Sequence, residues 1–308
     1  MAKRKSDGTD KPSRKKRAGD QNSYYARTAR PIYGLWFILP FIILYEVLVL
    51  MVNPQLLSES ASNIRGAVVS FVWVQNFLQS IGMNTKNAWL FAPVVVILTL
   101  ITLQFTCRQS WKVRLSDFLI MAGECIVLAI PLIVLALVLN RSPKPQSTTG
   151  VFNEITRCSF IAPLQTDQLG DGNSHQTGAG LHLRSIKMDM LTGIGAGIYE
   201  ELIFRLVLIS LSMTFFEMIL GMSKTNAIIV SVIISSVLFS LHHHFVFLNG
   251  QFAKTQEFFT MTRFAFRTIA GIFFAIVFAV RGFGIAAGTH AFYDIIATLL
   301  NAWLFEHC

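Results

Sequence analysis

Charged residues are scarce in this chain. Asp, Glu, Lys and Arg together make up 14% of the 308 residues, whereas hydrophobic residues make up 53% and the mean hydropathy is +0.53. A soluble globular domain usually carries about 25% charged residues. The composition therefore excludes an ordinary soluble globule and is typical of a protein that crosses a membrane several times.

Cysteine is also rare, and its spacing contains no metal or redox motif. The four cysteines are Cys107, Cys125, Cys158 and Cys308, and no two of them form a CxxC pair. Cys125 lies inside a hydrophobic segment, so the sequence predicts no disulfide framework. A cysteine-based metal site is excluded on the same grounds.

Positive charge is concentrated at the N-terminus. Residues 1–30 hold ten Lys and Arg against three Asp, a net charge of +7, so the other 278 residues contribute only +2. No folded basic module with interleaved aromatic residues follows, which argues against nucleic acid as a partner. Positive charge before a first span favours a cytoplasmic N-terminus. We therefore expect a multi-pass protein of the cell (inner or plasma) membrane, with the lipid bilayer as its partner.

Long apolar runs indicate about seven membrane spans. A helix needs about 20 apolar residues to cross the hydrocarbon core. Residues 67–78 are expected to form an amphipathic helix at the membrane surface. The fold class that follows is all-α, a polytopic transmembrane helical bundle. The expected spans are residues 31–52, 88–106, 118–139, 191–220, 226–247, 264–280 and 289–305.

A polar stretch after the third span indicates a domain boundary. Residues 140–189 are rich in Ser, Thr, Gly and Pro, which is typical of a loop. The loop proper is taken as 140–184. The chain then divides into a disordered basic cytoplasmic tail at 1–30, three N-terminal transmembrane helices at 31–139, an extracytoplasmic loop at 140–184 and a second membrane domain at 185–305.

Ionisable side chains inside the spans are costly in hydrocarbon and are functional by default. Glu124 in the third span is expected to snorkel or to pair with a structural partner. Glu201 and Arg205 are four residues apart, so on a helix they face each other. Glu200 lies about 100° around that helix and is left without a partner there. Glu200 is therefore the candidate for chemistry.

Three motifs follow one another on successive hydrophobic segments. Residues 200–205 read EELIFR and match EExxxR, residues 239–243 read FSLHH and match FxxxH, and residues 290–294 read HAFYD, a variant of HxxxN. Together they resemble the CPBP family of intramembrane proteases, the type II CAAX prenyl protease and bacteriocin-processing group, also called the abortive-infection family. The resemblance covers about residues 185–305 and implies a CPBP-type catalytic core there.

The resemblance implies an intramembrane endopeptidase, a hydrolase that cleaves a membrane-associated or processed polypeptide. Glu200 would be the general base that activates water, and His243 would share that water. Glu201 and Arg205 would hold the helix and orient the site. Burial makes a carboxylate a better base, so these roles are physically coherent.

The resemblance further implies that His290 and Asp294 stabilise the oxyanion. An ionised Asp cannot donate a hydrogen bond. Asp294 is therefore protonated, or orients His290, or is a ligand. The last alternative leaves zinc open as a cofactor, with Glu200, His243 and His290 forming a His₂Glu site that keeps one position for water. No cofactor is assigned, and the metal-free glutamate protease is preferred to the zinc metalloendopeptidase.

Two points of geometry remain open at this stage. The four-residue spacing of the second motif selects His243, since His242 points about 100° away on a helix. Counted along the spans, Glu200 and His243 lie roughly 26 Å deep but His290 only about 9 Å deep. If the three meet, the Gly-rich residues 282–288 must lie within the membrane region as irregular backbone lining a cavity.

Two function classes other than a protease are open. A cation- or metal-handling transporter would use the same carboxylates and imidazoles, but would spread them along a path through the bilayer. A non-catalytic membrane scaffold would need only the Glu201–Arg205 pairing. A protease instead requires Glu200, His243 and His290 in one pocket.

Overall fold

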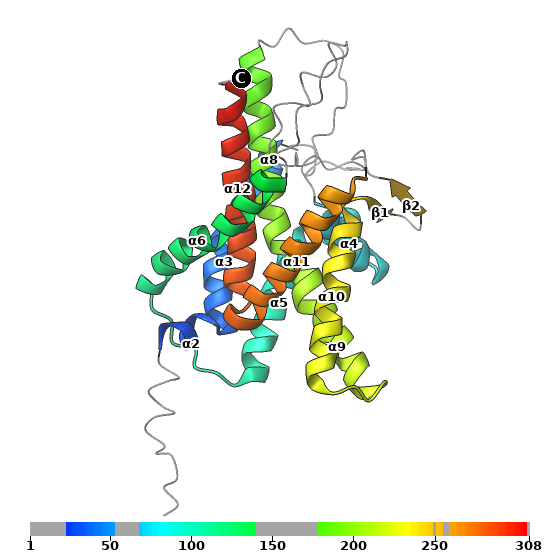
Figure 1. Ribbon diagram of the computed structural model, residues 1–308. Helices are drawn as coiled ribbons and strands as arrows, with labels where there is room; N and C mark the ends of the chain where they lie inside the picture. Colours follow the sequence, from blue (N-terminus) through cyan, green and yellow to red (C-terminus); the bar gives the residue numbers. More distant parts are fainter. Residues whose placement is uncertain (1–22, 53–67, 140–177, 249–250, 255–258, 307–308) are drawn as a thin grey trace, which may run out of the picture.

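The structure is a computed structural model of the chain, and it describes residues 23–52, 68–139, 178–248, 251–254 and 259–306 (Figure 1). Of the predicted disordered tail at 1–30, residues 1–22 lie outside this part, whereas Tyr24–Thr28 form a helix, so the prediction is wrong for these residues. Residues 140–177, most of the predicted extracytoplasmic loop, lie outside the described part as well.

The described residues form a bundle of helices with one short strand pair, which confirms the all-α class. The hairpin of β1 and β2 is antiparallel, with Phe245 opposite Lys254 and Leu248 opposite Gln251. The elements are α2 (Tyr24–Thr28), α3 (Pro31–Val52), α4 (Val69–Ser80), α5 (Thr85–Cys107), α6 (Ser116–Leu139), α8 (Gly178–Glu200), the π-helix η3 (Glu201–Leu208), α9 (Ile209–Met218), α10 (Lys224–His242), β1 (Phe245–Leu248), β2 (Gln251–Lys254), α11 (Met261–Arg281) and α12 (Phe283–Glu306).

Six helices of the described part are long and apolar enough to cross a membrane, namely α3, α5, α6, α10, α11 and α12. The expected seventh span, residues 191–220, corresponds to the continuous run of α8, η3 and α9. It is not among the six, because the run is divided into three elements and the only long one, α8, contains four charged residues, Arg184, Lys187, Asp189 and Glu200. The run also begins at residue 178, so residues 178–189 are helical and not part of a loop.

The predicted span 226–247 is too long at its C-terminal end. Helix α10 ends at His242, and the chain turns into β1 at Phe245. The residues between the two strands are Asn249-Gly250. Asn-Gly is the commonest signal for a two-residue hairpin turn. Residues 245–247, which were predicted as the end of a span, therefore belong to strand β1 of the hairpin.

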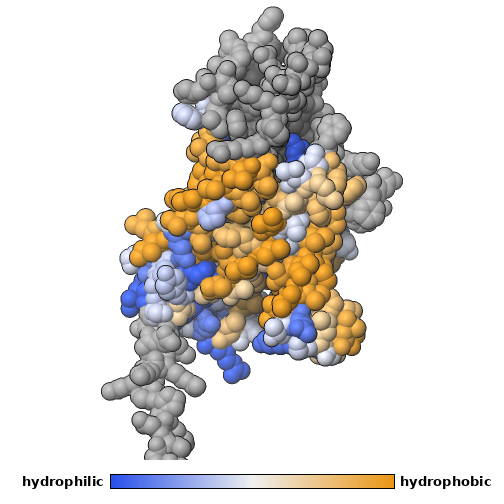
Figure 2. All heavy atoms as spheres, viewed as in Figure 1, coloured by the Kyte–Doolittle hydropathy of each residue, from blue (hydrophilic) through white to orange (hydrophobic). Residues whose placement is uncertain are grey.

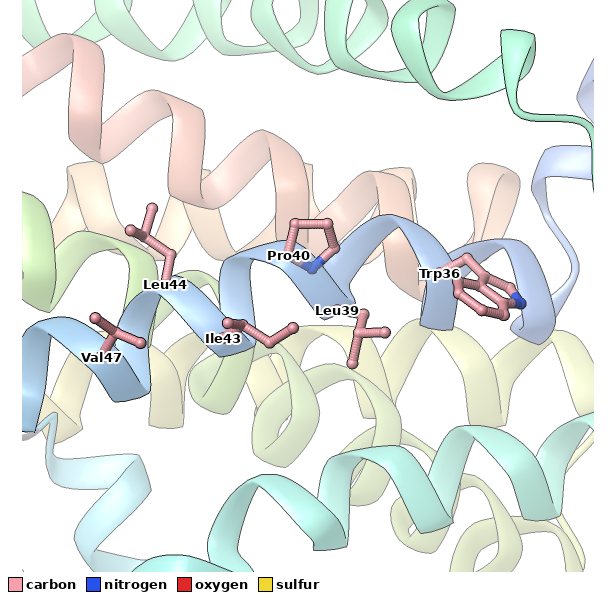
Figure 3. A pocket seen from close by; sticks show the side chains of 6 residues that line it. All are labelled: Trp36, Leu39, Pro40, Ile43, Leu44 and Val47. Atoms are coloured by element: carbon pink, nitrogen blue, oxygen red, sulfur yellow. The ribbon is translucent and has the colours of Figure 1, made fainter.

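The outer surface of the bundle is apolar, as expected for contact with lipid. Figure 2 shows hydrophobic side chains across the middle of the visible face, with hydrophilic ones gathered toward the end where α2 lies. A groove of about 450 Å³ follows α3 at Pro40 and contains no residue of the three motifs (Figure 3). Its lining is Trp36, Leu39, Pro40, Ile43, Leu44 and Val47.

A polar network fastens α2 to two spans at one end of the bundle. The Arg281 guanidinium donates from Nη2 to Glu124 Oε2 at 2.8 Å and to Thr28 Oγ1 at 2.8 Å. The Tyr24 hydroxyl donates to the same Glu124 oxygen at 2.8 Å. Glu124 thus has a structural partner, which was one of its two expected roles.

The Gly-rich residues 282–288 do not form irregular backbone, so that prediction is wrong. Only Gly282, with φ of 80°, interrupts the helices, and α12 begins at Phe283. A Cβ on Gly34 of α3 would lie 3.1 Å from the Gly284 nitrogen, which is closer than ordinary contact. The small residues therefore serve close packing of α12 against α3, and the segment is buried within the bundle.

Candidate active site

The three motifs meet where α8 passes into η3. Glu200 is the last residue of α8, while Glu201 and Arg205 lie in the π-helix. Single π-turns inside α-helices frequently occur at functional sites. The extra residue in the turn widens the helix at the point where two carboxylates face in different directions.

Glu201 joins the first motif to the third. Its Oε2 lies 3.2 Å from Arg205 Nε, and its Oε1 accepts a hydrogen bond from His290 Nδ1 at 2.9 Å. Arg205 is fully buried, and its Cζ lies 4.4 Å from the centre of the Phe239 ring. The expected Glu201–Arg205 pair is present, and a cation–π contact supplements it. Glu201 is thus fixed by two partners and positions the His290 ring.

Glu200 faces three imidazoles. Its Oε1 lies 3.3 Å from His242 Nε2, and its Oε2 lies 3.8 Å from His243 Nε2 and 4.0 Å from His290 Nε2. The Glu200 side chain is 3% exposed, and Oε2 has no hydrogen-bond partner. A buried carboxylate oxygen without a partner is costly unless a water, a proton or a cation reaches it.

His242, which the motif spacing had set aside, makes the shorter contact with Glu200. It is the last residue of α10, His243 follows in a helical conformation, and the two rings lie 4.1 Å apart, so both reach Glu200. Its Nδ1 donates to the Phe239 carbonyl oxygen at 2.7 Å. In a neutral ring, Nε2 would then turn its lone pair toward the Glu200 carboxylate. A proton or a cation between them removes that repulsion.

The same residues fit a zinc ion. Within the described part of the chain, ligand atoms of Glu200, His242 and His243 lie within 4.8 Å of one another. Zinc holds such ligands at about 2.1 Å in tetrahedral geometry, so ligand atoms lie about 3.4 Å apart. The contacts of 3.3 Å from Glu200 Oε1 to His242 Nε2 and of 3.8 Å from Glu200 Oε2 to His243 Nε2 are close to that spacing, although they start from different carboxylate oxygens. His242 takes the place that the sequence had given to His290, whose Nε2 lies farther from Glu200, at 4.0 Å from Oε2.

Asp294 lies one turn beyond His290 on α12. Its Oδ2 is 3.6 Å from His290 Nε2 and has no hydrogen-bond partner. The His290 ring stacks on Phe274 of α11, with ring centres 4.5 Å apart. The hydrogen bond to Glu201 and the Phe274 ring fix the orientation of this imidazole, and the role of Asp294 stays a prediction.

Two glycines of α8 let α12 come close enough to build the site. These two helices make the most extensive contact in the bundle and run side by side in Figure 1. A Cβ on Gly197 would lie 2.7 Å from the Ala291 nitrogen, and one on Gly193 would lie 2.6 Å from Asp294 Cβ. Small residues four apart are a common device for close helix approach in membranes. This spacing was readable in the sequence.

Two further side chains near the site were missed by the motif reading. Glu46 of α3 accepts a hydrogen bond from the Tyr199 hydroxyl at 3.4 Å, immediately before Glu200. Trp73 of α4 lies against His242, with ring centres 5.8 Å apart. Glu46 could have been found, since it is an ionisable residue inside the first apolar run. No sequence signal marks Trp73.

Comparison with known proteins gives one match. A family model described as Type II CAAX prenyl endopeptidase Rce1-like matches residues 184–296. Neither the curated proteins nor the solved structures contain a match. The matched segment includes Glu200, Glu201, Arg205, His243, His290 and Asp294, and it excludes helices α2 to α6.

Proposed function

We propose that the chain is a multi-pass membrane protease of the type II CAAX prenyl endopeptidase kind, whose family model matches residues 184–296, and that Glu200 is its general base. Glu200 would take a proton from water, which attacks the peptide carbonyl without a covalent intermediate, and would return that proton to the leaving nitrogen as the C–N bond breaks. The observation that carries the proposal is the unpartnered Glu200 Oε2, with imidazole nitrogens 3.8 and 4.0 Å away.

Some of the surrounding residues would position the attacking water, and others would stabilise the oxyanion. His243 and His242 would hold the water against Glu200. His290, oriented by Glu201 and Asp294, would face the developing oxyanion, a term that is usually large in acyl transfer. Arg205 would keep the neighbouring Glu201 in place, since the two form an ion pair at 3.2 Å.

Zinc is the second candidate for the same reaction, and the geometry of His242 supports it. Glu200, His242 and His243 would hold the ion. A bound zinc would lower the pKa of its water to near neutral and polarise the substrate carbonyl. In the metal-free glutamate protease, a proton shared between His242 and Glu200 would take the place of the zinc ion. The chelator experiment below separates the two.

We also propose the substrate class and the setting. The substrate is a polypeptide in or at the membrane, and the family's description points to prenylated C-terminal sequences. The N-terminus lies in the cytoplasm, because ten basic residues precede the first span. The membrane is the cell (inner or plasma) membrane. The division into N-terminal helices 31–139 and a catalytic domain 185–305 belongs to this proposal, whereas the predicted bounds of the tail and the loop do not, because α2 occupies Tyr24–Thr28 and α8 begins at Gly178. Because Glu200, His243 and His290 lie in one compact cluster, the arrangement favours a protease over a transporter, which would spread these residues along a path through the bilayer.

The test compares purified wild type with Glu200→Gln and Glu124→Gln on two fluorescent peptides, one farnesylated at a C-terminal Cys-aliphatic-aliphatic-Met and one with a transmembrane anchor. We expect Glu200→Gln to lose 10²- to 10⁴-fold in rate, as for a general base, and to keep its melting temperature. Glu124→Gln, a carboxylate outside the site, should cleave at the wild-type rate per folded molecule. Full activity of Glu200→Gln would refute the assignment. Loss to chelator with rescue by zinc would establish the metalloprotease.

A further inference from the structure

The β1–β2 hairpin begins beside the candidate site, at its exposed side. The side chain of His243 is 26% exposed, whereas those of Glu200, His242, His290 and Asp294 are between 3% and 9% exposed. The cluster therefore opens at His243. Strand β1 starts two residues later, about 7 Å along an extended chain.

One edge of β1 has no strand partner among the described residues. The register places Leu248 opposite Gln251 and Phe245 opposite Lys254. In a hairpin closed by two residues, the flanking pair is hydrogen-bonded and every second pair is not. Phe245 and Phe247 therefore direct their N–H and C=O groups away from β2. Within the described part of the chain, no backbone group outside the hairpin is hydrogen-bonded to the backbone of Phe245, and Phe245 is 41% exposed.

We propose that an extended segment of the polypeptide substrate pairs with this outer edge of β1 as a third strand. The proposal rests on the protease function above. A peptide bond must leave helical structure to be attacked, and in an apolar setting its freed N–H and C=O groups need partners. An exposed strand supplies them at fixed spacing, as in other cases of strand addition to a sheet edge. The strand would lead the scissile bond past His243 toward Glu200.

The length and position of β1 favour a substrate over a second copy of this chain. The four residues of β1 span about 13 Å, enough to pair with a four-residue segment next to the scissile bond. A two-stranded hairpin is marginally stable by itself, so a third strand would stabilise it. The edge is continuous with the site through His243, which an interface between two copies would not require.

Binding is measured with the full-length Glu200→Gln variant in proteoliposomes, so that cleavage does not obscure it. The probe is the farnesylated peptide, made as a series with one N-methyl group at successive backbone amides upstream of the Cys. Each methyl group removes one donor. We expect Kd to rise about 3- to 10-fold at every second position, the worth of one hydrogen bond, with little change between.

The matched enzyme variants are Phe245→Pro and Phe252→Pro, made in the same background. Both remove an N–H that the register directs away from the partner strand, and proline is tolerated at such edge positions. Phe245→Pro should weaken binding of the unmodified peptide about 3- to 10-fold and shift or abolish the alternation. Phe252→Pro, on the far edge, should bind as the parent does.

Several outcomes overturn the edge proposal. These are a uniform response along the N-methyl series, equal effects of the two proline variants, or no saturable binding of the peptide to Glu200→Gln. Alternating Kd values combined with a wild type that cleaves neither peptide would instead refute the protease function and leave the edge in place. The two failures are therefore distinguishable.

Discussion

Replacing Gly197 by alanine should move α12, which carries His290 and Asp294, away from α8, which carries Glu200. The new methyl group would lie 2.7 Å from the Ala291 nitrogen, 2.8 Å from the Ala287 oxygen and 2.8 Å from the Ala291 Cβ. Two of these three atoms are backbone, so no side-chain rotation relieves the contact. Helix α12 must move by about 1 Å to restore contacts near 3.5–4.0 Å.

That movement carries His290 away from Glu200. Overpacking of this kind costs about 1–3 kcal/mol of stability, which a bundle of this size tolerates. A displacement of about 1 Å in a catalytic group costs about 100-fold in rate. We therefore expect kcat/KM for the farnesylated peptide to fall about 100-fold in Gly197→Ala, while thermal unfolding in detergent still shows a cooperative transition.

Gly123→Ala is the matched control for Gly197→Ala. Gly123 is also a mid-helix glycine, in α6, but a Cβ there meets no atom within 4 Å. Alanine is a better helix former than glycine by roughly 0.5–1 kcal/mol, so this variant should be as stable as wild type or more stable, with unchanged kcat/KM. Adding Ala291→Gly to Gly197→Ala should rescue little, since the two backbone contacts persist. Equal activity of the two alanine variants would show that glycine is not required for the approach of α12.

Two other changes test contacts outside the reacting groups. Arg281→Leu strands the Glu124 carboxylate and should cost about 3 kcal/mol of stability, whereas the double change to leucine at both positions should recover most of it; equal melting temperatures of the single and double variants would contradict the pairing. Tyr199→Phe removes the hydroxyl that donates to Glu46 at 3.4 Å, so we expect a loss of about 1 kcal/mol in thermal stability and less than a tenfold change in kcat. A much larger fall in kcat would make Glu46 part of the chemistry.

Helix periodicity was enough to predict that Glu201 faces Arg205 and that Glu200 points elsewhere. It was not enough to choose between His242 and His243. At the end of α10, both imidazoles reach Glu200, at 3.3 and 3.8 Å, so the direction in which each residue leaves the helix does not decide between them. The hairpin after α10 had a readable signal in Asn249-Gly250, but the apolar residues around that pair also fitted a continuing span. Periodicity alone does not decide such short apolar runs.

Counting residues from the predicted span ends placed His290 at the wrong depth in the membrane. The count assumed that all helices begin in one plane. Helix α12 instead begins beside the start of α3, where Gly284 meets Gly34, while α9 and the first turns of α10 extend beyond that level (Figure 1). A residue few turns into α12 can therefore lie level with one many turns into α10. The offset between helices is set by small-residue contacts such as that of Gly197 with α12, so depth follows from packing and not from length.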